Sequence, residues 1–264
     1  MRLSCRCYKV DSRNKGYTSK MSKPSRVYFF GTCLIDMLYP NAGMAAITLL
    51  QREGLEVIFP QNQSCCGQPA FNSGYRDEAL KVARSQLYLF KEDIPIVVPS
   101  ASCGGMMLHH WPELFEGQPD HQQACDVAAR VVEFADFLVN TLKIELQDKG
   151  QPTYIAVHHS CSAQREMNVA SSTDKLLAQL NEVTVEHHQR PTECCGFGGT
   201  FAVKQPDISG AMVEAKTQAI CATSAKSVIS QDCGCLMNIT GYAEKQQHDL
   251  KGQHIAEFLL ERTS

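Results

Sequence analysis

The sequence predicts an α/β protein of two pseudo-symmetric halves, each with a parallel sheet and cysteine loops at the carboxyl ends of its strands. Two observations lead to this prediction. Short apolar runs alternate with helical segments along the chain, as in parallel sheets covered by helices. Cys-Cys-Gly occurs twice, at 65–67 and 194–196, and each copy has one cysteine well before it and one well after it. An internal repeat of this kind predicts two similar structural units.

The composition is that of a folded protein. Of the 264 residues, 44% are hydrophobic and 20% are charged, so the chain can bury a sizeable core. The net charge of −3 argues against a nucleic-acid or anionic-membrane surface. No apolar run approaches the roughly 20 residues of a membrane helix. We therefore expect a cytoplasmic protein, which would reach the inner face of a membrane only through partners.

The chain has 13 cysteines, which is many for an intracellular protein. Disulfide frameworks are typical of small secreted domains without a large core, and this chain is large. Its first twenty residues also lack the apolar segment of a signal peptide. The cysteines therefore favour metal ligation over disulfides.

The first cysteine-rich half is expected at 26–122. It follows a basic, polar extension at 1–25 that lacks periodicity and is expected to be disordered. Apolar runs predict strands at 27–30, 55–59 and 94–98, and helical spacing predicts helices at 39–52, 75–90 and 106–115. Each strand leads into a loop with cysteine.

A connecting segment is expected at 123–152. Its apolar side chains follow helical spacing and predict one long amphipathic helix at 124–146, with a polar linker at 148–152.

The second cysteine-rich half is expected at 153–264. Strands are predicted at 154–157, 183–186 and 225–229, helices at 174–180 and 208–223, a helical turn after 235 and a closing segment at 254–262. Ligands of open α/β sheets bind at the carboxyl ends of the strands, so the cysteine loops of each half should converge on one place.

The spacing of the cysteines matches between the halves. In the first half, 31 residues separate Cys33 from Cys65 and 36 separate Cys66 from Cys103. In the second half, the corresponding numbers are 32 and 39, from Cys161 through the pair at 194–195 to Cys235. Sets of four thiolates suit iron–sulfur clusters or structural zinc. Zinc ligands usually come in short Cys-x2-Cys hooks, so a pair with two distant single cysteines favours a cluster.

These motifs resemble the cysteine-rich CCG domain family, which includes the cysteine-rich subunit of heterodisulfide reductase and the iron–sulfur subunit of glycolate oxidase. The resemblance covers about residues 26–262 and rests on CCGQPAFNSGY (65–75), PSASC (99–103) and CCGFGGTFAVK (194–204). Within the family, the chain is similar to the lactate-utilization subunits. The resemblance implies an oxidoreductase subunit that transfers electrons in a complex oxidising L-lactate to pyruvate. Its partners would be a ferredoxin-containing iron–sulfur subunit and a third small subunit.

The resemblance also implies one or two [4Fe-4S] clusters per chain. Their expected ligands are Cys33, Cys65, Cys66, Cys103, Cys161, Cys194, Cys195 and Cys235. Two other functions stay open. The chain could itself be a catalytic heterodisulfide or thiol reductase, or it could be a non-enzymatic zinc scaffold that holds partner subunits.

The sequence departs from the fullest family pattern, in which each half ends in Cys-x2-Cys. The first cysteine of that pair is replaced by Ser100 in one half and by Asp232 in the other. Four thiolates per half suffice for an ordinary [4Fe-4S] cluster but not for the enlarged clusters of heterodisulfide reductase. Cys233 is one residue away from the expected position and is interpreted as a small residue on the wrong face of the turn, with a spare ligand as the alternative.

Several other residues are given ordinary roles. Cys5 and Cys7 have no partners nearby in the sequence, and Cys125 and Cys221 fall inside predicted helices and are expected in the core. Trp111 is interpreted as packing. The three His-His pairs lack the spacing of a zinc motif, although His159 could donate to a cluster sulfur.

Overall fold

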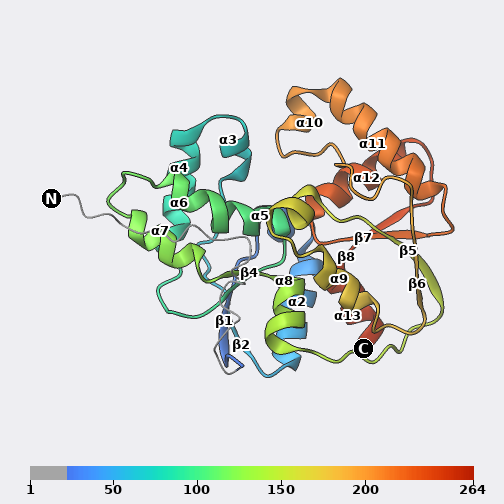
Figure 1. Ribbon diagram of the computed structural model, residues 1–264, viewed down its shortest axis with the longest axis horizontal. Helices are drawn as coiled ribbons and strands as arrows, with labels where there is room; N and C mark the ends of the chain where they lie inside the picture. Colours follow the sequence, from blue (N-terminus) through green and yellow to red (C-terminus); the bar gives the residue numbers. More distant parts are fainter. Residues whose placement is uncertain (1–22) are drawn as a thin grey trace.

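Two four-stranded parallel sheets form the framework of the computed structural model, which describes residues 23–264 (Figure 1). The first sheet contains β1 (Arg26–Phe29), β2 (Glu56–Ile58), β3 (Ile96–Val98) and β4 (Val131–Glu133), in the order β2-β1-β3-β4. The second contains β5 (Thr153–Val157), β6 (Val183–Glu186), β7 (Ser227–Ser230) and β8 (Lys251–His254), in the order β6-β5-β7-β8. The same strand order in both sheets confirms the predicted pseudo-symmetric α/β halves. Cys5, Cys7 and most of the predicted extension at 1–25 lie outside the described residues.

Helices follow the strands and the cysteine loops in both halves. In the first half these are α1 (Cys33–Leu38), α2 (Pro40–Arg52), α3 (Gln68–Asn72), α4 (Arg76–Leu87), α5 (Ala101–Gly105), the π-helix η1 (Met106–His110), α6 (Trp111–Leu114), α7 (His121–Ala128), α8 (Phe134–Asp136) and the π-helix η2 (Phe137–Leu142). In the second half they are the π-helix η3 (Ser162–Glu166), α9 (Ala170–Leu177), α10 (Phe201–Lys204), α11 (Pro206–Cys221), α12 (Cys233–Lys245) and α13 (Ile255–Thr263).

The single long helix predicted at 124–146 is wrong. The chain leaves α7 after Ala128, forms β4 beside β3, and becomes helical again at Phe134. All three residues of β4 are buried, and in so short a run the pairing of an edge strand overrides the helical spacing of apolar side chains. Arg130 fixes the entry to the strand by donating to the carbonyls of Phe90 and Ile94, at 2.9 and 3.1 Å.

Helices of each half pack on helices of the other half. The final helix of the second half, α13, packs on α2 of the first half, while α8 and η2 of the first half pack on α9 of the second. Figure 1 shows these helices between the two sheets. One hydrophobic core runs through this region and takes residues from both halves, such as Leu50, Phe137, Leu176 and Leu259. The halves are therefore held in a fixed relation by a shared core.

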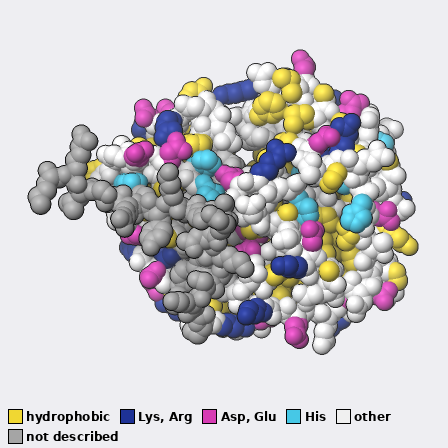
Figure 2. Space-filling view, viewed as in Figure 1, with side chains coloured by type: hydrophobic (Ala, Val, Ile, Leu, Met, Phe, Trp, Pro, Cys, Tyr) yellow, Lys and Arg dark blue, Asp and Glu magenta, His cyan; other side chains and the backbone are white. Residues whose placement is uncertain are grey.

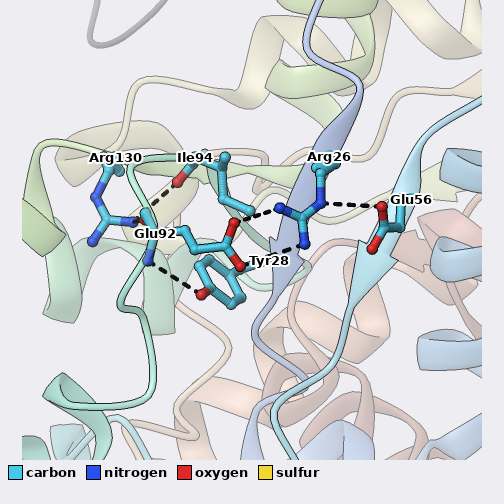
Figure 3. A network of polar contacts seen from close by, with 6 residues as sticks. All are labelled: Arg26, Tyr28, Glu56, Glu92, Ile94 and Arg130. Carbon is cyan, nitrogen blue, oxygen red and sulfur yellow. Dashed lines mark hydrogen bonds and ion pairs between the residues drawn. The ribbon is translucent and has the colours of Figure 1, made fainter.

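A polar network closes the amino end of the first sheet (Figure 3). Arg26 at the start of β1 pairs with Glu56 of β2 at 3.0 Å and with Glu92 in the loop before β3. The N–H of Glu92 in turn donates to the hydroxyl of Tyr28, at 3.3 Å. These contacts join the amino ends of neighbouring strands, so the opposite, carboxyl end of the sheet is left to the cysteine loops.

The surface carries few large apolar side chains. One group lies over α10 and the start of α11, where Val203 is 82% exposed and Ile208 is 55% exposed, and Figure 2 shows hydrophobic side chains gathered in this region. In the part of the chain that the structure describes, no helix is both long and apolar enough to span a bilayer.

Candidate metal centres

Four cysteine sulfurs of the first half form a continuous chain of contacts. Cys33 begins α1 after β1, Cys65 and Cys66 follow β2, and Cys103 lies in α5 after β3. The Cys65 thiol group is hydrogen-bonded to Cys33 and to Cys66, and the sulfurs of Cys66 and Cys103 lie 3.4 Å apart. The structure therefore brings together the four residues that the sequence assigns to the first site.

The second half repeats this chain in the same order. The Cys194 side chain is hydrogen-bonded to Cys161 and to Cys195, and Cys195 is hydrogen-bonded to Cys235 at the start of α12. Cys161 is exposed, whereas Cys195 and Cys235 are buried. Each site thus has a buried floor made by its last two cysteines, and the second opens to the surface at its first.

Each Cys-Cys-Gly segment turns in the way that its glycine allows. Gly67 and Gly196 have φ of 90° and 86°, in the left-handed region that favours glycine. A Cβ on Gly67 would lie 3.1 Å from the carbonyl oxygen of Ala79, and one on Gly196 would lie 2.8 Å from that of Ser209. The turn directs both sulfurs of a pair to one side, and each glycine N–H donates to the sulfur of the first cysteine at 3.4 Å.

The first cysteine of each pair is placed to be a thiolate. Hydrogen bonds from Cys33 and Cys66, helped by the N–H of Gly67, lower the pKa of Cys65 to about 3. Hydrogen bonds from Cys161 and Cys195 lower the pKa of Cys194 to about 2. Contacts with neighbouring sulfurs, together with burial, raise the pKa values of the Cys33, Cys66, Cys161 and Cys195 thiols and favour their protonated forms. Metal binding would release these remaining protons, because thiolates are the ligand form.

Two side chains outside the cysteine sets, one buried and one half-buried, hold the turns in place. The indole N–H of Trp111 donates to the carbonyl of Cys66 at 3.0 Å, and the amide of Asn238 donates to that of Cys195 at 2.7 Å. Trp111 is fully buried, so its predicted packing role is confirmed, but the sequence did not reveal its hydrogen bond. The sequence could have indicated this hydrogen bond, because the indole N–H of a buried tryptophan usually finds an acceptor.

The two positions that depart from the family pattern meet between the sites. Asp232 is buried, and its Oδ1 accepts hydrogen bonds from the hydroxyls of Ser100 and Ser102, both at 2.7 Å. Its Oδ2 accepts from Ser160 of the second half. Oxygen atoms thus occupy the places of the fifth cysteines and link the halves.

The remaining described cysteines lie outside both chains of sulfur contacts. Cys233 is buried, and burial followed by the charge of Asp232 raises its pKa. Cys125 and Cys221 lie in α7 and α11 as predicted, but they are half-buried rather than core residues.

The histidines differ from the sequence prediction. His159 pairs through Nε2 with Asp174 at 2.9 Å, whereas its neighbour His158 is fully buried against the second site. A ligand atom of His158 and the sulfurs of Cys195 and Cys235 all lie within 4.8 Å of one another. His158, which the sequence analysis did not single out, is therefore the histidine that the structure places beside these two sulfurs.

The residues present fit a thiolate-bound metal group. Each site offers four sulfurs, the second site also has the imidazole of His158 nearby, and soft thiolates select zinc or iron–sulfur clusters. The N–H groups of Gly67 and Gly196 already point at sulfur, as do the donors that stabilise clusters. The clustered cysteines thus indicate metal or iron–sulfur binding.

Comparisons with known proteins agree with this arrangement. The model of the cysteine-rich domain family CCG matches residues 27–108 and 155–240, one match in each half. Lactate utilization protein A 2 of Bacillus cereus (strain Q1) is 38% identical over 245 residues, which cover 90% of this chain and 99% of that protein. Lactate utilization protein A of Bacillus pumilus (strain SAFR-032) is 40% identical over 241 residues, which cover 90% of this chain and all of that protein.

One solved structure shares the fold. A hypothetical protein from Helicobacter pylori superposes with a TM-score of 0.67 at 11% identity, over 92% of this chain and 50% of that one. At this identity the likeness concerns the fold alone.

Proposed function

The chain belongs to the cysteine-rich CCG domain family and is related over 90% of its length to lactate utilization protein A, and from this premise we propose that it is the iron–sulfur electron-transfer subunit of an L-lactate-oxidising complex. One observation supports this most strongly. Two sets of four cysteines, equivalent in position and in order of contact, lie at the carboxyl ends of two equivalent sheets. A duplicated thiolate site is suited to a pair of redox centres in one small protein.

The proposed ligands are Cys33, Cys65, Cys66 and Cys103 in the first site and Cys161, Cys194, Cys195 and Cys235 in the second. A bound [4Fe-4S] cluster would supply reversible one-electron chemistry at each site. The protein would hold it with thiolates, of which Cys65 and Cys194 are already stabilised by neighbouring donors. The buried floor of each site would limit water, and the N–H groups of Gly67 and Gly196 would donate to sulfur.

The oxygen atoms of Ser100 and Asp232 favour this function over a catalytic disulfide reductase. An enlarged cluster needs a fifth thiolate in each half, and at these positions the chain offers a hydroxyl and a carboxylate that hydrogen-bond to each other at 2.7 Å. Their hydrogen-bonding capacity is used between the halves. Four thiolates per site remain, which is the number that an ordinary cluster requires.

We further propose that the protein works with the other subunits of a lactate utilization complex, a ferredoxin-containing iron–sulfur subunit and a third small subunit. The exposed apolar side chains around Val203 and Ile208 support this, because they gather just after the second Cys-Cys-Gly loop (Figure 2) and a contiguous apolar patch on a surface marks an interaction site. An electron partner docked here would be close to the second site.

Reconstitution tests the proposed function. The anaerobically prepared chain, alone and with its two partner subunits, is assayed for lactate-dependent reduction of a dye. We expect activity only in the complex, and we expect Cys33→Ser and Cys161→Ser each to abolish it while Cys221→Ser leaves it unchanged. Full activity of the complex with either of the first two variants would contradict the proposal.

A further inference from the structure

The two sites have equivalent sets of four cysteine ligands but differ at the residue three positions before the first cysteine. Phe30 and His158 are equivalent, because each follows the first strand of its sheet and donates its N–H to the neighbouring strand. The acceptors are Val97 at 3.0 Å and Ile229 at 2.8 Å. Both side chains are fully buried. Phe30 packs in one hydrophobic cluster with Cys66 and Cys103, so the first site has a benzyl ring where the second has an imidazole.

A second pair of equivalent residues differs in charge. Gln86 and Lys216 each lie seven residues after the residue whose carbonyl faces the Cys-Cys-Gly glycine, and both are buried. The amide of Gln86 exchanges two hydrogen bonds with Ser64, both 2.8 Å long. The ammonium group of Lys216 donates to the carbonyl of Arg190. The first site is therefore bordered by a neutral amide and the second by an ammonium group.

His158 has hydrogen-bonding capacity that the protein does not use. Neither ring nitrogen has a hydrogen-bond partner within residues 23–264, although the side chain is fully buried. An imidazole ring carries at least one N–H whether it is neutral or protonated. The sulfurs of Cys195 and Cys235 are the nearby groups that can accept it.

Lys216 acts on the same sulfurs through its charge. Burial lowers the pKa of Lys216, and electrostatic interactions of its ammonium group with Cys195, Cys194 and Cys235 act in the opposite direction. Glu193 also acts on Lys216, but its carboxylate is already bound by Arg190 at 2.7 Å. Asp232 opposes Lys216 at the second site.

Asp232, however, lies between the two sites. It is hydrogen-bonded to the N–H and hydroxyl of Ser102, next to Cys103, as well as to Ser160, next to Cys161. Its negative charge therefore affects both sites and contributes less to the difference between them.

We infer that His158 and Lys216 make the second site the more easily reduced of the two, an inference that rests on the proposed function. Reduction adds a negative charge to a site. A buried ammonium group stabilises that charge, and so does an N–H that can donate to sulfur, whereas a phenyl ring and an already paired amide do so far less. His158 and Lys216 are thus positioning and tuning residues of the second site rather than ligands.

A redox titration followed by electron paramagnetic resonance tests the inference on the anaerobically prepared full chain. His158→Phe and Lys216→Gln, singly and together, give the second site the residues of the first. Lys226→Gln removes an exposed lysine of the same half and serves as the matched control. Cys161→Ser identifies which reduction step belongs to the second site.

The unmodified chain should be reduced in two steps, and Cys161→Ser should remove the one at higher potential. The double variant should make reduction of the second site at least tenfold less favourable, which for one electron is about 59 mV. The other step should stay in place, and Lys226→Gln should move neither. If the double variant does not fold, Lys216→Gln alone must lower the same step.

Two results would overturn the inference. The first is loss of the lower-potential step in Cys161→Ser, and the second is an unchanged second-site step in the folded variants. Both results require chains loaded with iron and sulfide, so they leave the proposed function standing. A chain that binds no iron and sulfide would overturn the proposed function itself.

Discussion

Replacing Gly196 by alanine tests whether the turn of the second Cys-Cys-Gly segment depends on glycine. The residue has φ of 86°, and the left-handed region costs a residue with a Cβ about 1–2 kcal/mol. The new Cβ would also lie 2.8 Å from the carbonyl oxygen of Ser209 and 3.1 Å from Cβ of Met212. A backbone oxygen cannot move aside as a flexible side chain can, and overpacking of this kind costs about 1–3 kcal/mol. Together, we expect a loss of about 2–5 kcal/mol in the free energy of unfolding.

Gly54 provides the matched control. Its φ is 80°, but a Cβ there would meet no atom within 4 Å. Gly54→Ala should therefore lose only the conformational part, about 1–2 kcal/mol. The difference between the two variants isolates the contacts with Ser209 and Met212.

Urea unfolding of the reduced, metal-free protein measures both variants, because bound metal would otherwise add its own binding free energy to the stability. We also expect Gly196→Ala to retain less metal at the second site, since the clash must displace the turn that positions Cys194 and Cys195. Equal destabilisation by the two alanine substitutions, with full metal retention in both, would refute the reasoning.

Three further predictions concern buried polar groups. Arg262→Met removes the two hydrogen bonds, of 2.8 and 2.7 Å, that Arg262 donates to the buried carboxylate of Asp148. We expect urea unfolding to show a loss of about 3 kcal/mol in the free energy of unfolding, and a loss under about 1 kcal/mol would contradict this. The hydrogen bonds from Arg262 also lower the pKa of Asp148. The pair therefore stabilises the fold above the unfolded pKa of about 3.9, and this stabilisation is lost as the pH falls through the folded pKa. The thermal midpoint should consequently be less sensitive to acid below about pH 4 in Arg262→Met than in the unmodified chain. Trp111→Phe leaves the buried carbonyl of Cys66 without its donor and should cost about 2 kcal/mol in the same unfolding assay, whereas a neutral effect would show that the hydrogen bond adds nothing to the packing of the ring. Burial raises the pKa of Glu133 to about 8, so stability should decrease as the pH rises from about 4.3 to 8. Glu133→Gln should flatten this part of a plot of thermal midpoint against pH. An unchanged plot would contradict the assignment of this pH dependence to Glu133.

The sequence was most informative where one physical cause determines the structure. Runs of apolar or β-branched residues predict strands, so six of the eight strands could be located, including the edge strand Val183–Glu186 with its bounds. The glycine of each Cys-Cys-Gly segment required a left-handed backbone, and both glycines have it. The matched spacing of the cysteines then followed from two sheets with the same strand order.

The two missed strands, β4 and β8, each form one edge of a sheet, and their residues do not distinguish them from the segments on either side. β8 reads Lys-Gly-Gln-His, which contains neither an apolar run nor an alternation of apolar and polar residues. β4 is apolar but has only three residues, and its spacing continues the pattern of the helices on either side. Both strands are defined by pairing with a neighbour that is distant in sequence, so neither could be recognised from its own residues.

The candidate site shows the same division. Its eight cysteines could be chosen from spacing, but their surroundings could not. The choice between His158 and His159 depends on which residue of the loop faces inward, and the roles of Gln86 and Lys216 depend on how α4 and α11 pack. Ser100 and Asp232 stood out as departures from a pattern, but that they bind each other across the halves required the fold.

The central claim is that both cysteine sets hold iron–sulfur clusters. Iron, acid-labile sulfide and zinc measured together in the anaerobically purified chain test it most directly. Two [4Fe-4S] clusters predict about eight iron and eight sulfide per chain without stoichiometric zinc, and Cys33→Ser or Cys161→Ser should each lower both numbers to about four. Stoichiometric zinc without sulfide would contradict the account and leave a thiolate scaffold in its place.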